Sequence, residues 1–205
     1  MKKAVLILIL ITSSLWVSAQ KIQLGPNIGG NYAIFPVGIG VEYDGASLGY
    51  NFGLSGQIHL KNKFYLSPEI NFEHKVYRSK IGDSFKAIQR GSSVIISTPA
   101  KYVLGKDKNF YFYVGPYIAY LLKYDYTLYF VNNENYYQNL THKFQRYELG
   151  FLVGLGYSRP ITDKMTLFID ANYSESLYHF GSAEYKGNSK LRAIRLRLGC
   201  LFTIK

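Results

Sequence analysis

Apolar and polar side chains alternate along most of this chain, and the alternation constrains its fold more than any other feature. Residues 47–61 read SLGYNFGLSGQIHLK, where Leu48, Tyr50 and Phe52 alternate with small or polar residues. A period of two residues indicates a β-strand whose two faces meet different surroundings. Eight segments have this period, so we predict an all-β fold of eight strands. The segments span residues 22–32, 47–61, 64–79, 92–104, 110–126, 144–159, 165–179 and 191–204.

The connections between these segments alternate in length. Three are short and rich in turn-forming residues, and four are longer. The short ones are 62–63, 105–109 and 160–164, and the long ones are 33–46, 80–91, 127–143 and 180–190. In an up-and-down barrel all short turns lie at one end, as they do in outer-membrane barrels. We therefore predict an eight-stranded antiparallel up-and-down transmembrane β-barrel in the outer membrane, with both termini periplasmic.

One face of the predicted strands carries the charges and the other carries the large apolar residues. An Arg or Lys that faces lipid at mid-bilayer costs about 2–4 kcal/mol, so the charged face is expected to point inward. The interior of eight strands is just wide enough to be filled by side chains. We predict a polar, side-chain-filled lumen with an interior charge network. Its members are Glu69, Glu73, Lys75, Lys101, Lys123, Glu148, Asp170, Arg195 and Arg197.

A soluble, secreted ligand-binding barrel would instead bury the apolar face and expose the charged one. Alternation alone fits that fold equally well. The unequal connections and an aromatic content of 17% favour the membrane barrel. Tyrosines in the apolar phase lie near strand ends, where membrane barrels place interfacial aromatic residues. They are Tyr50, Tyr102, Tyr120, Tyr124, Tyr147, Tyr157 and Tyr173.

The N-terminus reads as a signal peptide. Lys2 and Lys3 precede the apolar run 4–11, and Val17-Ser18-Ala19 forms a cleavage site before Gln20. We predict that residues 1–19 are removed and that 20–205 form the barrel domain. The formal charge of +11 is not concentrated in one patch. It therefore favours contact with outer-membrane lipids, including lipopolysaccharide, over nucleic acid.

Five stretches, taken in order, resemble a known family. They are FYLSPEINFEHKVY, SSVIISTPAKYVLG, FYFYVGPYIAYLL, YELGFLVGLGYSRPI and LRLGCLF. In these stretches the chain resembles the PorT-type outer-membrane β-barrel family of Bacteroidota. The resemblance implies a small barrel of the porin type, and some relatives are linked to secretion or maturation of exported proteins. It also implies that the barrel-assembly machinery engages the C-terminal strand, although Phe202 is followed by three further residues.

The sequence contains little that suggests chemistry. Four histidines lack metal-ligand spacing, no nucleotide-binding motif is present, and Cys200 is the single cysteine. We expect no metal and no cofactor. Ser176, His179 and Glu175 suggest a lipid-modifying enzyme at the barrel rim. However, Ser176 and His179 are three residues apart and so face opposite sides of a strand, and we predict no enzyme.

We predict a non-enzymatic structural or interaction role, accessory to secretion or to surface binding. The connection 127–143 contains Tyr136 and Tyr137 among asparagines, a composition that suits contact with a protein partner. A narrow pore, a lipid-modifying rim enzyme and a soluble secreted binding barrel are the alternatives.

Overall fold

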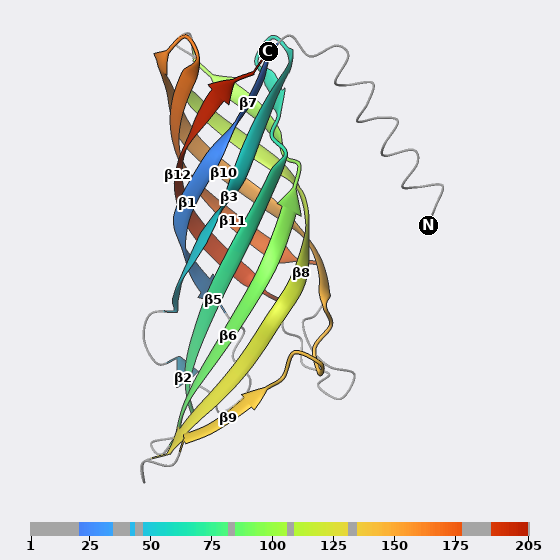
Figure 1. Cartoon of the computed structure of the whole chain (residues 1–205), viewed down its shortest axis with the longest axis vertical. Helices are drawn as coiled ribbons and strands as arrows, with labels where there is room; N and C mark the ends of the chain where they lie inside the picture. The colour runs from blue at the N-terminus through green and yellow to red at the C-terminus, as the bar shows by residue number, and fades with distance from the viewer. Residues whose placement is uncertain are drawn as a thin grey trace, which may run out of the picture.

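The structure, a computed structural model, describes residues 21–34, 42–43, 47–81, 85–105, 109–130, 135–177 and 190–204. In these residues the chain forms antiparallel β-strands that close into a barrel (Figure 1). The strands are β1 Ile22–Ile34, β2 Glu42–Tyr43, β3 Leu48–Lys61, β4 Phe64–Leu66, β5 Glu69–Ile81, β6 Phe85–Ser97, β7 Ala100–Leu104, β8 Phe110–Phe130, β9 Asn135–Asn139, β10 Tyr147–Thr162, β11 Met165–Ser176 and β12 Arg192–Thr203. Among the described residues, no helix has the length and apolar character needed to cross a membrane.

The barrel wall consists of eight units, each of which is a single strand or two strands that follow one another in line. This confirms the predicted eight-stranded architecture. Strands β4 and β5 together form the third unit, and β6 and β7 form the fourth. Each unit pairs with the next in chain order, and β12 pairs with β1 to close the ring. The predicted signal peptide lies outside the described residues.

Prolines interrupt two neighbouring strands at the same place. The third and fourth units were expected to be continuous, but Pro68 separates β4 from β5 and Pro99 separates β6 from β7. Proline has no backbone N–H to donate to a sheet. Its carbonyl still accepts, since the Gly56 and Ser67 amides donate to the Pro68 and Pro99 oxygens at 2.7 and 2.9 Å. The pairing between neighbouring strands therefore continues across both interruptions.

The short turns gather at one end of the barrel, here called the short-turn end. In the turn between β3 and β4, Asn62 has a φ of 56°, a left-handed conformation that asparagine tolerates. Gly105, which follows β7, has a φ of 75°. Strand β1 begins and β12 ends at this same end (Figure 1). The opposite end is called the long-connection end.

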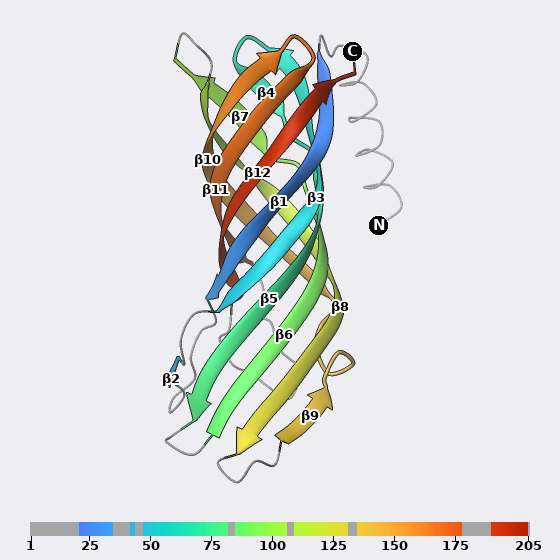
Figure 2. The same cartoon turned by 60° about the vertical axis from the view of Figure 1, so that its left-hand side comes forward.

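At the long-connection end, β5, β6 and β8 continue well past the ends of β1 and β3 (Figure 2). Strand β9 pairs with the far part of β8, and β2 pairs with the end of β5. Residues 75–81, 85–92, 123–130 and 135–139 are called the projecting sheet. The prediction that 80–91 and 127–143 are loops is therefore wrong for most of their length. The apolar periodicity fades there because neither face of the sheet has a purely apolar environment.

The two faces of the barrel wall are distributed as predicted. Outward residues such as Leu48, Leu155 and Leu198 have 66%, 68% and 59% of their surface exposed. Inward polar residues are buried, and Glu73 and Arg197 expose only 1% and 4%. Apolar side chains outside and ionised side chains inside are the arrangement of a barrel in lipid.

Aromatic pairs mark both edges of the outward apolar band. Tyr120 and Tyr147 contact each other near the long-connection end, with ring centroids 5.2 Å apart. Phe110 and Tyr157 do so near the short-turn end, at 5.0 Å. Tyr147 and Tyr157 lie ten residues apart on one strand, which is about 33 Å along the strand and about 25 Å along the axis of a barrel tilted by roughly 40°. That height matches the apolar band of outer-membrane barrels.

Candidate functional site

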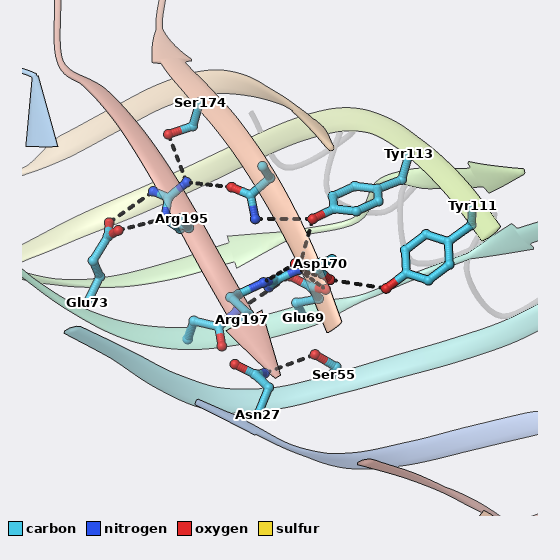
Figure 3. Close-up of polar contacts among 12 residues, drawn as sticks. Asn27, Ser55, Glu69, Glu73, Tyr111, Tyr113, Asp170, Ser174, Arg195 and Arg197 are labelled. Atoms are coloured by element: carbon cyan, nitrogen blue, oxygen red, sulfur yellow. Dashed lines mark hydrogen bonds and ion pairs between the residues drawn. The ribbon is translucent and has the colours of Figure 1, made fainter. Parts of the chain in front are cut away.

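The last strand supplies two arginines to the centre of the lumen. Arg195 binds Glu73 of β5 through two hydrogen bonds, Nε to Oε1 at 2.6 Å and Nη2 to Oε2 at 3.0 Å (Figure 3). Its Nη1 donates to Asn172 and Ser174 of β11 at 3.1 and 2.8 Å. Lys75 lies 3.0 Å from the same Glu73 carboxylate. The Glu73 carboxylate thus pairs with two cations, and all three groups are buried. The pair with Arg195 connects β5 with β12 across the lumen.

Arg197 forms a second centre, two residues further along β12. Its guanidinium binds Asp170 at 2.9 and 3.0 Å and Glu69 at 2.6 and 3.2 Å (Figure 3). The same group donates to the Tyr113 hydroxyl at 3.1 Å, and the Tyr111 hydroxyl donates to Asp170 at 3.3 Å. A guanidinium shared between two carboxylates is a strong, directional arrangement.

The remaining interior charges use polar and aromatic partners. Lys101 donates to the Gln57 side chain at 2.7 Å, and its Nζ lies 3.6 Å from the centre of the Tyr111 ring. Glu148 accepts a hydrogen bond from the Tyr117 hydroxyl. The structure thus brings eight of the nine predicted network residues into the lumen.

The ninth residue, Lys123, is not in the lumen, and that prediction is wrong. The register between β6 and β8 shifts by one residue at Ser92 and Ser93, so Leu122 is an extra residue on β8. The shift reverses the alternation, and Lys123 lies exposed on the outer face, 2.8 Å from Asp125. The same shift buries Tyr124 on the inner face, where an outward girdle residue was predicted.

Without Lys123 the interior charges balance. The inward-facing acids are Glu69, Glu73, Glu148 and Asp170, and the inward-facing bases are Lys75, Lys101, Arg195 and Arg197. Four negative and four positive charges make this network neutral overall. A neutral, paired network meets the requirement that buried charges be compensated.

Tyrosines of β8 fill the space between the charges, and glycines of β10 make room for them. Gly150 lies opposite Tyr117 and Gly154 lies opposite Tyr113. A Cβ at either glycine would lie 2.4 Å from the ring of that tyrosine. Among the described residues, one small cavity lies beside Lys75 and another beside Lys101, each of about 20 Å³. A cavity of that size holds about one water molecule.

Inward asparagines are a part of the lumen that the sequence-based prediction missed. Asn31 of β1 donates to the backbone oxygens of Tyr50 and His74, both at 3.1 Å. Asn51 of β3 is 1% exposed, and its amide nitrogen and oxygen have no hydrogen-bond partner within the described chain. Bound water is the expected partner for such a group. The signal that could have predicted this is the alternation itself, because Asn31 and Asn51 both occupy the polar, inward-facing phase of their strands.

The predicted partner residues Tyr136 and Tyr137 lie on β9, at the free side of the projecting sheet. They are 53% and 57% exposed and point to opposite faces of the strand. The Tyr137 hydroxyl donates to Asp125 on β8 at 2.8 Å. Two exposed tyrosines on a strand that is hydrogen-bonded to its neighbour are suitable for contact with another protein.

The predicted rim residues do not assemble into a catalytic set in the described chain. Ser176 is fully buried, and its hydroxyl accepts a hydrogen bond from the Leu191 amide at 2.8 Å. Glu175 faces outward and pairs with Arg192 at 3.3 Å. His179 lies outside the described residues.

No group of three or more histidine, cysteine, aspartate or glutamate side chains within the described ranges is arranged to hold a metal ion. Cys200, half-buried on β12, is a free cysteine.

Comparisons with known proteins agree with this geometry. A family model described as an outer membrane protein beta-barrel domain matches residues 18–181. No curated protein matches the sequence. Among solved structures, the outer membrane protein OprG from Pseudomonas aeruginosa is similar with a TM-score of 0.50 and 11% identity, over 91% of this chain and 97% of that chain. Neisserial surface protein A is similar with a TM-score of 0.47 and 14% identity, over 88% and 96% of the two chains. At 11% identity the similarity to OprG shows the fold alone.

Proposed function

Since this chain belongs to the family of outer membrane protein beta-barrel domains, we propose that it is a non-enzymatic outer-membrane barrel that acts by binding at the cell surface. In this proposal the long-connection end faces outward and both termini are periplasmic. The membrane part anchors and orients the projecting sheet, which carries the contact surface.

The filling of the lumen by paired charges and tyrosines is the observation that supports this proposal. The paired network around Arg195 and Arg197 joins β5, β11 and β12 across the barrel. Tyrosines of β8 pack beside it, and the two cavities hold only about one water molecule each. Transport through such an interior would require that buried ion pairs separate, so a structural or binding role is favoured over a narrow pore.

Recordings in planar lipid bilayers test the sealed lumen. We expect purified, folded protein to give no resolved single-channel current in 1 M KCl. Steady channel openings by the folded protein would favour the pore alternative. Heat-modifiable gel mobility of the same sample supplies the control that the barrel is folded.

Labelling of intact cells tests the orientation. In a Cys200→Ser background, Asn135→Cys places a thiol on exposed β9, and Asp163→Cys places one in the exposed turn before β11. A membrane-impermeant maleimide should label Asn135→Cys in intact cells and Asp163→Cys only after the outer membrane is opened. The reverse pattern would show that the projecting sheet faces the periplasm.

We further propose a protein partner at Tyr136 and Tyr137. A photoreactive residue placed at either position should form a specific crosslinked product on intact cells. The same residue at Ile194, which is 48% exposed on the outward face of β12, is the lipid-facing control. Equal products from all three positions would indicate unspecific contact.

The resemblance to PorT-type barrels of Bacteroidota supports an accessory role in secretion as the form that this binding takes. Deletion of the gene should then lower the amount of exported proteins in the medium, and a Tyr136→Ala/Tyr137→Ala variant should restore export poorly.

Two further parts of the proposal concern biogenesis. The signal peptide should be cleaved before Gln20, which N-terminal sequencing of the mature protein measures, and the barrel-assembly machinery should engage β12.

A further inference from the structure

The outer face of the projecting sheet is strongly basic. Residues paired directly across neighbouring strands share a face, so the register identifies its members. On β5, β6 and β8 they are Val76, Arg78 and Lys80, then Ser92, Arg90, Ile88 and Lys86, and then Lys123, Asp125, Thr127 and Tyr129, with His74 of β5 at the boundary to the barrel wall. On these three strands five side chains are lysine or arginine and one, Asp125, is a carboxylate, while Glu42 of β2 pairs in register with Lys80. The excess of positive charge lies on the face that continues the lipid-facing side of the barrel.

Three arginines on or beside this face make no ion pair in the described chain. Arg90 donates to the Thr127 hydroxyl at 3.3 Å, and exposed Arg146 donates to the Tyr120 hydroxyl at 3.2 Å. Arg78 is exposed on β5. Asp125 is the cross-strand neighbour of Arg90 on β8, but its carboxylate is already bound by Lys123 at 2.8 Å and by the Tyr137 hydroxyl at 2.8 Å. None of the three guanidinium groups therefore has a carboxylate partner within the described chain.

The opposite wall of the barrel differs. Its outward arginine at the long-connection end, Arg192 of β12, is paired with Glu175 of β11 at 3.3 Å. Lys190 lies 3.7 Å from the same carboxylate. Among the described arginines at the long-connection end, those without an ion pair thus lie on β5 and β6 and just before β10.

These arginines lie just beyond the aromatic edge of the apolar band. Arg146 is next to Tyr147, and Tyr147 contacts Tyr120 in the girdle. Arg78 is four residues beyond His74, which stacks on Tyr50 with a centroid distance of 5.1 Å. Four residues span about 13 Å along a strand, and less along the membrane normal. This is the depth at which lipid headgroups lie next to an outer-membrane barrel.

We propose that Arg78, Arg90 and Arg146 bind the phosphate groups of a phosphorylated glycolipid in the outer leaflet. Guanidinium groups bind phosphate oxygens in pairs, and an adjacent apolar wall accommodates the acyl chains. The inference rests on the proposed function, because it requires the long-connection end to face the outer leaflet. It adds the ligand class and the wall that holds it.

A lipid-binding measurement on the purified full chain in detergent tests the site. Native mass spectrometry compares bisphosphorylated lipid A with the same lipid after dephosphorylation. We expect at least about tenfold tighter binding of the phosphorylated form, with a preference that weakens as salt rises. The Arg78→Gln/Arg90→Gln/Arg146→Gln variant should lose at least about tenfold in affinity for it.

A matched control removes the same charge from the other end of the barrel. Lys61, Arg159 and Lys164 are exposed near the short-turn end. The Lys61→Gln/Arg159→Gln/Lys164→Gln variant should therefore keep the affinity of the wild type. Heat-modifiable mobility shows that both variants are folded. Equal binding of the two lipid forms, or an equal loss in both variants, would overturn the proposal. So would tighter binding of a soluble sulfated polysaccharide at the same arginines.

Labelling of intact cells separates this inference from the proposed function. If Asn135→Cys is labelled only after the outer membrane is opened, the proposed function fails, whatever the lipid measurement gives. If it is labelled on intact cells and the phosphate preference is absent, the binding role stands and the lipid site is refuted.

Discussion

Replacement of Arg195 by methionine tests the interior network directly. The Arg195→Met change removes a guanidinium that makes two hydrogen bonds to Glu73 and two more to Asn172 and Ser174. Glu73 is 1% exposed and would keep Lys75, at 3.0 Å, as its cationic partner. The variant therefore carries an incompletely compensated carboxylate in a place that water reaches poorly.

The expected loss of stability is large. Removal of one partner from a buried pair costs about 3–5 kcal/mol, against a total of about 5–15 kcal/mol for a typical domain. With a urea slope of about 2 kcal/mol per M, a loss of 4 kcal/mol lowers the unfolding midpoint by about 2 M. Arg192 on the same strand is the matched control, because its pair with Glu175 is exposed and contributes about 0–1 kcal/mol.

The assay is urea unfolding in lipid vesicles, followed by far-UV circular dichroism and by gel mobility. Tryptophan fluorescence does not suit this protein, since the single tryptophan, Trp16, lies in the predicted signal peptide. The Glu73→Gln/Arg195→Met double variant should recover part of the lost stability, because it removes the carboxylate charge that Arg195→Met leaves without its main partner. If the free energies of unfolding of Arg195→Met and Arg192→Met differ by less than about 1 kcal/mol, the network does not stabilise the barrel as proposed.

Two further predictions concern packing and lipid exposure. Gly115→Ala should destabilise the barrel by about 1–3 kcal/mol, because the new Cβ would lie 2.4 Å from Pro99 Cα. Gly30→Ala, with no atom closer than 3.8 Å, should be tolerated in the same unfolding assay, and equal effects would refute the packing argument. Leu198→Arg, midway along β12 and facing lipid, should cost about 2–4 kcal/mol, and Leu122→Arg near the edge of the apolar band about 0–1 kcal/mol. A similar cost at both leucines would mean that the band is placed wrongly.

The sequence was sufficient to predict which side of each barrel strand faces lipid. A strand between hydrocarbon and an ionic interior must alternate strictly, so Leu196 and Arg195 could be assigned to opposite faces. The alternation predicts a direction but not a partner. Nothing in the local sequence pairs Arg195 with Glu73, which lies 122 residues away and meets it only across the closed lumen.

The errors have two physical causes. Lys123 was placed inside because a single-residue register shift against Ser92 and Ser93 leaves no clear local signal, yet it reverses every later side chain. The parts of the projecting sheet within residues 80–91 and 127–143 were predicted as loops, because both faces of the sheet are partly polar there. Its strands then lack the contrast on which the period-two prediction depends. The interruptions at Pro68 and Pro99 were also missed, although a proline within a predicted strand is itself a signal of interruption.

The position of both lumen arginines on the final strand has a consequence for assembly. A chain that ends between β11 and β12 still contains Glu69, Glu73 and Asp170, but it lacks their principal cations, Arg195 and Arg197. A prematurely ended chain would carry several uncompensated acids into its interior as well as two unpaired edges. Completion of the ring and neutralisation of its contents thus occur in one step, which disfavours the survival of truncated copies.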